Sequence, residues 1–180
     1  MIKKRVAKPM IKKKLIESIT ENAAELTQKN ILVKETAQGG DRQAWEKAAQ
    51  DFHHHYNRLA FPGGLKEALN LLKQNDPATI EVAIVYLEAD PYFHRSGYIK
   101  QQIARLLKQS ILSEQNILQI QAVLLQFIQQ GRGRQEHEYN RLAKKIKTPA
   151  FIESLQEIVR TTKDVGISRR AKNMLAILLG

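Results

Sequence analysis

Apolar residues recur every three or four positions along most of the chain, and this spacing constrains the fold more than any other feature. One segment places five of them on a single helix face: Ile117, Ile120, Leu124, Phe127 and Ile128. No segment shows the sustained alternation of β-branched and polar residues that marks a half-buried strand. Leu, Ala, Gln, Lys and Glu at helical spacing dominate instead. The sequence therefore predicts an all-α protein.

Residues that begin and end helices divide this pattern into segments. Three dipeptides place an oxygen-bearing cap before a proline, which suits the first helical position because it has no N–H to satisfy: Asp76-Pro77, Asp90-Pro91 and Thr148-Pro149. Ser113 and Ser168 are further predicted caps, and Gly131 and Gly166 are predicted helix ends. We therefore expect helices over residues 14–34, 42–60, 65–75, 77–89, 96–109, 114–130, 135–147, 149–163 and 168–179.

Basic residues gather at the beginning of the chain, within a formal net charge of +11. Residues 1–14 hold seven Lys or Arg and no acid. Since Pro9 interrupts a helix and the lysines repel one another, we expect a disordered basic arm here. Such an arm contacts nucleic-acid backbone regardless of sequence, or serves solubility alone. Residues 15–75 then form N-terminal helices that share one compact domain, 15–180, with the rest.

From residue 77 onward the predicted helices fall into three pairs, which begin near residues 77, 114 and 149. Helix pairs of this period stack into solenoids. The last pair, "TPAFIESLQEIVRTTKDVGISRRAKNMLAILLG", resembles the HEAT and armadillo class of α-helical repeat, whereas the first pair departs from it by carrying Ser96-Gly97 in its turn. The resemblance covers residues 76–180. It implies antiparallel helix pairs stacked as a short HEAT-like α-solenoid after extra N-terminal helices, although an antiparallel bundle has a similar pattern.

Charge differs between the first and second helices of these pairs. The resemblance implies that second helices line the concave side, and here they are mostly basic, whereas the first helices are mostly acidic. A concave basic surface binds phosphates, and an aromatic ring on it can stack on a base. The alternative is a solvated side whose Lys and Arg stems cover apolar neighbours. The residues predicted to bind nucleic acid are Tyr98, Lys100, Arg105, Lys108, Arg132, Arg134, Arg141, Lys144, Lys145, Arg169, Arg170 and Lys172.

Three consecutive histidines, His53–His55, raise the question of a metal site. On a helix they point about 100° apart, so they cannot converge on one ion. No HExxH, GxSxG or phosphate-loop motif is present, and we therefore predict no metal, no cofactor and no catalytic residue. The hypothesis of a nucleic-acid enzyme stays open, with its acid or base among Glu81, Glu88, Asp90 and the histidines.

Two further features bear on partners and location. The chain lacks cysteine and any long apolar run, so we expect a soluble, cytoplasmic protein that meets no membrane. Residues 174–179 are apolar around much of the helix, which predicts that another subunit or the N-terminal helix covers helix 168–179. The leading functional hypothesis is a module that binds DNA or RNA. The alternative is a scaffold or adaptor subunit whose basic face meets an acidic protein.

Overall fold

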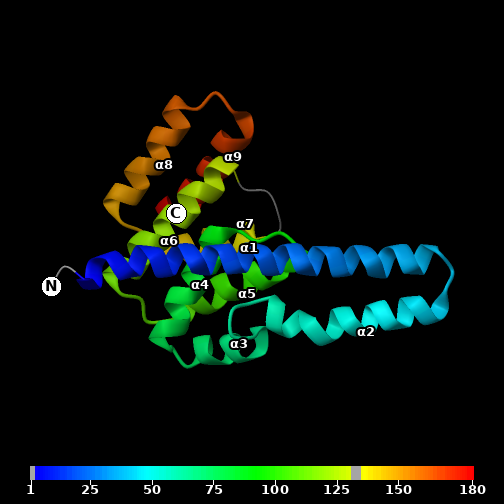
Figure 1. Ribbon diagram of the computed structural model, residues 1–180. Coiled ribbons are helices and arrows are strands. Elements are labelled where there is room, and N and C mark those ends of the chain that lie inside the picture. Colours follow the sequence, from blue (N-terminus) through cyan, green and yellow to red (C-terminus); the bar gives the residue numbers. More distant parts are fainter. Residues whose placement is uncertain (1–2, 131–134) are drawn as a thin grey trace. The chain divides into compact units, whose positions relative to one another are not determined.

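A computed structural model describes residues 3–130 and 135–180, and from residue 10 onward it describes side chains as well. All regular structure in these ranges is helical, and no strand occurs there, which confirms the all-α prediction (Figure 1). The chain forms two compact units, Met1–Ser96 and Gly97–Gly180. The expected boundary after residue 75 and the expected single compact domain both differ from this division. The first predicted helix pair is split between the two units.

The N-terminal unit contains four complete helices: α1 (Lys3–Gln38), α2 (Arg42–Leu59), α3 (Leu65–Lys73) and α4 (Pro77–Ala89). The first two form a long antiparallel hairpin (Figure 1). Their connection needs Gly40, whose φ of 75° is strained for any residue with a Cβ. Asp41 then caps α2, because its carboxylate accepts the N–H of Ala44. The same unit packs α1 against α4 and buries Ile19, Ala23 and Leu26 of α1.

The first helix is longer than expected. We predicted a helix over residues 14–34 after a disordered arm, but α1 is continuous from Lys3 to Gln38 and includes Pro9. One contact helps to fix the N-terminal part of this helix, since Lys12 Nζ lies 2.7 Å from Glu88 Oε2 of α4. Lysine also favours helix despite its charge. Mutual repulsion between neighbouring lysines therefore does not set the helix boundary here.

The C-terminal unit contains most of α5 (Ser96–Gln109), followed by α6 (Glu114–Gln130), α7 (Glu136–Lys145), α8 (Pro149–Thr161) and α9 (Val165–Leu179). Contacts between α5 and α7 join early residues to early ones and late residues to late ones, so these helices run parallel. Helices α7 and α9 also run parallel, by the same reasoning. Helix α6 runs antiparallel to α7, because Gln121 donates to the carbonyl of Ile146 across 2.7 Å. This order is compatible with a stack of helix pairs.

Most of the predicted helix starts are confirmed at atomic level. Asp76, Ser113 and Thr148 each accept a main-chain N–H from the first turn of α4, α6 and α8. The predicted cap at Asp90 is wrong, because this residue has a φ of 44° and ends α4 instead.

The start of α9 also differs from expectation. Asp164, rather than Ser168, is its N-cap and accepts the N–H of Ile167 at 2.8 Å. Gly166 therefore lies in the first turn of α9 and ends no helix, because α8 has already ended at Thr162 in an extended conformation. The predicted helix end at Gly131 lies outside the described residues.

The apolar face of α9 is covered within its own unit. Met174 and Leu178 are fully buried, and α9 packs against α6, α7 and α8. These neighbours supply cover that the sequence analysis assigned to the N-terminal helix or another subunit. Leu179 remains 64% exposed, so self-association through the end of the helix stays a prediction. None of the described helices combines the length and apolar character required to cross a membrane.

Candidate functional site

Helix α7 lies at the centre of the charged groups in the C-terminal unit. Its first turn carries Glu136 and Glu138, its last residue is Lys145, and Lys147 follows two residues later. This distribution stabilises the helix, because acidic side chains at the N-terminus and basic side chains at the C-terminus interact favourably with the helix dipole. At each end one side chain contacts α9 and the other contacts α5 or the residue that follows it. The sequence places these four residues so that α7 is tied to both neighbours.

Three basic side chains are used to bind main-chain carbonyls. Lys145 donates to the carbonyl of Ser110 across 2.5 Å, Lys147 to that of Leu178 across 3.4 Å, and Arg170 to that of Ile128 across 2.9 Å. All three carbonyls lie at or just beyond the end of a helix as described, where main-chain carbonyls lack intrahelical partners. A cation there also interacts favourably with the helix dipole. We therefore assign these three residues a structural role first.

A buried carboxylate holds two arginines at the surface. The side chain of Glu138 is only 6% exposed, and its Oε1 lies 3.1 Å from Arg105 Nη2 and 3.9 Å from Arg141 Nη1. Its Oε2 has no hydrogen-bond partner among the described residues. Burial of an ionised carboxylate is costly unless cations compensate, so the two arginines stabilise it. Both arginine side chains are more than half exposed and can still bind an anion.

Other cations of this unit are accessible and have no partner within the described part of the chain. Lys144, Lys163 and Lys172 are exposed, and Lys108 is partly exposed. Within the described ranges no hydrogen bond or ion pair involves their ammonium groups. Arg169 is also largely exposed and approaches Glu136 only to 3.7 Å. These five side chains retain most of their capacity to bind phosphate oxygens.

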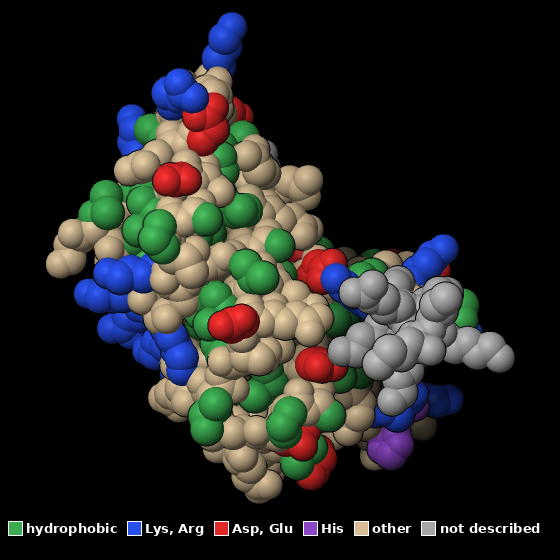
Figure 2. Space-filling model, turned by 90° about the vertical axis from the view of Figure 1, so that its left-hand side faces the viewer, with side chains coloured by type: hydrophobic (Ala, Val, Ile, Leu, Met, Phe, Trp, Pro, Cys, Tyr) green, Lys and Arg blue, Asp and Glu red, His purple; other side chains and the backbone are tan. Residues whose placement is uncertain are grey.

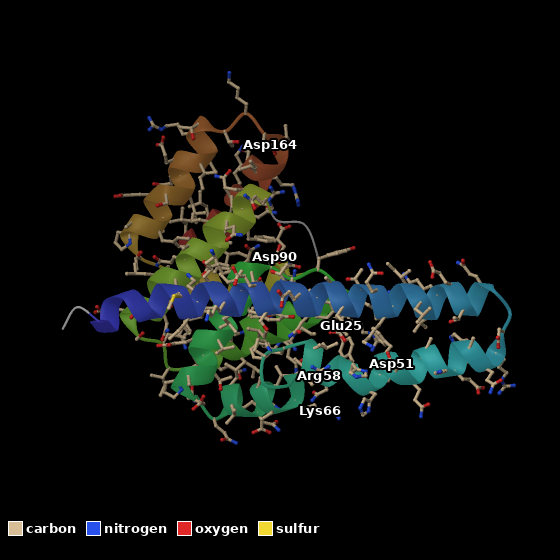
Figure 3. The ribbon with its side chains drawn as sticks, in the orientation of Figure 1. Glu25, Asp51, Arg58, Lys66, Asp90 and Asp164 are labelled. Atoms are coloured by element: carbon tan, nitrogen blue, oxygen red, sulfur yellow. The ribbon has the colours of Figure 1, made fainter. Side chains whose placement is uncertain are left out.

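A shallow pocket of about 430 Å³ lies where α8 turns into α9. Three cations line it, Lys163, Arg169 and Lys172, together with polar groups of Thr162, Ser168 and Asn173. Asp164 also lines the pocket, but its carboxylate already accepts the N–H of Ile167 as the helix cap (Figure 3). The pocket is therefore net positive and rich in hydrogen-bond donors, which suits a phosphate group.

The remaining residues predicted to bind nucleic acid have different environments. Tyr98 is exposed on α5, whereas Lys100 is only 4% exposed. Arg132 and Arg134 lie outside the described residues. Sequence reasoning left Lys163 out of the binding set and gave no role to the buried Glu138. The contact between Glu138 and Arg105 could have been predicted, because the two residues lie about one repeat period apart in the sequence.

The three histidines belong to the N-terminal unit. His53 and His54 are exposed, and His55 approaches the carboxylate of Asp51 at 3.2 Å. Figure 3 shows Asp51 on α2, facing α1, where Lys29 donates to its carboxylate across 2.6 Å. This hydrogen bond, with the charge of Lys29, lowers the pKa of Asp51. Within residues 10–130 and 135–180, no three metal-binding side chains of the His, Cys, Asp or Glu type come together.

Positive charge is unevenly divided between the two units. Residues 97–180 contain 14 Lys and Arg against 6 Asp and Glu, whereas residues 1–96 contain 15 against 12. The formal net charges are therefore +8 and +3. The C-terminal unit thus has the stronger attraction for polyanions. Figure 2 shows one face of the molecule, with a group of Lys and Arg side chains at its left-hand edge and others at the top and on the right. Comparisons with protein-family models, curated proteins and solved structures gave no match for this chain.

Proposed function

We propose that the protein binds the phosphate backbone of nucleic acid, DNA or RNA, through the C-terminal unit. The observation that carries the proposal is the excess of cations in residues 97–180, several of which have accessible side chains without a partner in the described structure. Lysine and arginine bind phosphate oxygens irrespective of base sequence, and each contact releases counterions from the polyanion. Catalysis is not part of the proposal.

The binding surface extends over parallel helices of the same unit. Arg105 on α5 and Arg141 on α7 approach one buried carboxylate, so their exposed groups lie close together. Arg169 and Lys172 on α9 line the pocket beside Lys163. A continuous strand of phosphates can contact several of these groups at once. We further propose that the helix pairs form a short HEAT-like stack, a proposal supported by the parallel order of α5, α7 and α9.

The experiment is direct binding of the full chain to labelled single- and double-stranded DNA and RNA over a range of salt concentrations. A variant reverses four charges of the proposed surface, Lys144, Lys163, Arg169 and Lys172, each to Glu. A matched control reverses four exposed cations of the N-terminal unit with the same change in net charge: Lys47, Arg58, Lys66 and Lys73. Arg58 and Lys66 are labelled in Figure 3.

The first variant should lose most of its affinity, and its salt dependence should become shallower by about 0.9 logarithmic units for each phosphate contact removed. The control should retain the salt dependence of the unmodified protein. Equal losses in both variants would attribute binding to net charge alone, which contradicts a site on the C-terminal unit. Absence of any binding near physiological salt would contradict the proposed function as a whole.

A scaffold or adaptor is the second candidate function, and one observation favours it. The α1–α2 hairpin exposes Ile31, Leu32 and Trp45, three large apolar residues. Exposed aromatic and aliphatic side chains are typical of protein contacts. Substitution of all three by Ser should leave the affinity for nucleic acid unchanged, because the proposed nucleic-acid surface lies on the C-terminal unit. A loss of nucleic-acid affinity in this variant would contradict a role of the hairpin in protein contacts alone.

A further inference from the structure

The turn that follows α4 holds its backbone firmly while one large side chain points away from the protein. Residues 90–95 all belong to the N-terminal unit. Pro91 and Phe93 are buried, and the N–H of Phe93 donates to Ser96 Oγ across 3.2 Å. Between these two anchors Tyr92 is 87% exposed, the highest value among the exposed large apolar residues of the described structure. Burial of both neighbours therefore forces Tyr92 outward.

Two side chains from the hairpin lie against the carbonyl groups of the same turn. Thr27 of α1 donates its one hydroxyl hydrogen to the carbonyl of Ala23 in its own helix at 2.8 Å, and its Oγ1 lies 3.4 Å from the carbonyl of Tyr92. Tyr56 of α2 donates through its hydroxyl to the carbonyl of His94 at 3.1 Å. Burial raises the pKa of Tyr56, so the phenol stays protonated and can donate at neutral pH. The turn is thus held by hydrogen bonds with Tyr56 of α2 and Ser96 of α5 before any ligand arrives.

The backbone at the end of the turn is strained. Arg95 has a φ of 68°, in the left-handed region that residues with a Cβ rarely adopt. Asp90 also has a positive φ, 44°, but it ends α4, where this conformation is common. Strained residues of this kind persist only where the surrounding structure fixes them, and they concentrate at ligand sites. The strain directs Arg95 outward, where its side chain is exposed.

Two cations lie near His94, the second residue after Tyr92. Arg95 belongs to the same turn, and both Arg95 and Lys34 of α1 act on the charge of His94. Burial lowers the pKa of His94, and these two cations lower it further, so His94 is neutral at pH 7. Asp90 places one carboxylate at the opposite end of the turn. An exposed aromatic ring beside Arg and Lys is the arrangement with which proteins bind single-stranded nucleic acid.

We propose that Tyr92 stacks on an unpaired base of single-stranded nucleic acid, while Arg95 and Lys34 bind the phosphates beside that base. This inference rests on the proposed function and adds to it a base-contacting element in the other unit. Bases of a duplex are stacked within the helix and cannot cover the ring, so the turn favours single strands. Every base has a flat π-face, so the contact carries little sequence preference.

The test compares Tyr92→Phe, which keeps the ring, with Tyr92→Leu, which keeps an apolar side chain without a ring. The probes are a single-stranded oligothymidylate that carries one 2-aminopurine and a duplex of equal length. Tyr92 is largely exposed, so both variants should fold, and circular dichroism checks that the helices are retained.

Tyr92→Phe should bind the single strand and quench 2-aminopurine fluorescence as the unmodified protein does. Tyr92→Leu should lose single-strand affinity by about 5- to 100-fold, together with the quenching, and should bind duplex unchanged. Single-strand binding by Tyr92→Leu at full affinity would overturn the stacking inference and leave the proposed function intact. Equal losses for single strand and duplex would also overturn it. A protein that binds neither probe would overturn both proposals.

Discussion

Two basic residues on α9, Arg170 and Lys172, should respond in opposite ways to the same substitution. Arg170→Met removes a hydrogen bond from Nε to the carbonyl of Ile128, a group at the C-terminal end of α6 as far as the described residues extend. A bond from a charged donor contributes about 1.5–3 kcal/mol, and a smaller contribution, near or below the lower limit, applies here because Arg170 is partly exposed. Methionine keeps much of the apolar stem, so we expect a loss of about 1–2 kcal/mol of unfolding free energy.

Lys172→Met removes an equal charge from an exposed position without a partner among the described residues. Its effect on stability should stay within about 0.5 kcal/mol. Thermal unfolding followed by circular dichroism should then show a lower Tm by about 2–8 °C for Arg170→Met and little change for Lys172→Met. Binding to duplex DNA over a salt series should show the reverse order, with a shallower slope for Lys172→Met. Equal changes in Tm, or a larger loss of binding in Arg170→Met after correction for unfolded protein, would refute the division into structural and binding cations.

Three further predictions concern single carboxyl groups. Asp164→Ala should lower stability by about 1 kcal/mol in chemical denaturation because the N–H of Ile167 loses its cap, whereas Asp164→Asn should keep the cap and bind inorganic phosphate more tightly at the pocket. Glu138→Gln should raise affinity for duplex DNA, because Arg105 and Arg141 are released from a buried anion, and a fall in affinity would instead make Glu138 a positioning residue. Hydrogen bonds from Thr79 lower the pKa of Asp76 below 3.8, so its contribution to stability should be present above about pH 3.8 and lost as the pH falls through the lower folded value. Urea titrations at several pH values should show this loss in the unmodified protein and not in Asp76→Asn.

The sequence predicted most helices because each helix boundary depends on neighbouring residues. Thr148 before Pro149 caps α8 as expected, since a cap needs only a side-chain oxygen and the next turn. The start of α9 was harder, because Asp164 and Ser168 both fit a cap and only the path of the chain after α8 decides between them. Local pattern therefore predicts that a helix exists more reliably than it predicts the residue where the helix begins.

The sequence predicted that the candidate site is basic, but it did not predict which basic side chains bind main-chain carbonyls and which have no partner among the described residues. Lys144 and Lys145 are adjacent in the sequence, yet Lys145 donates to the carbonyl of Ser110 and Lys144 has no partner among the described residues. Nothing local separates them, since the acceptor comes from a segment distant in the sequence. The turn with Tyr92 was missed for a similar reason. Its exposure follows from burial of Pro91 and Phe93, and only tertiary packing reveals that burial.

Four charged side chains at or just beyond the two ends of α7 restrict its movement: Glu136, Glu138, Lys145 and Lys147. A helix held on both sides at both of its ends can neither rotate about its axis nor slide without breaking several contacts at once. A displacement of α7 would therefore carry α5 and α9 with it. A ligand that spans these helices meets charges already set at fixed spacing and spends little conformational entropy in ordering them. The C-terminal unit should then bind most tightly those polyanions whose charges are spaced like the cations of α5, α7 and α9.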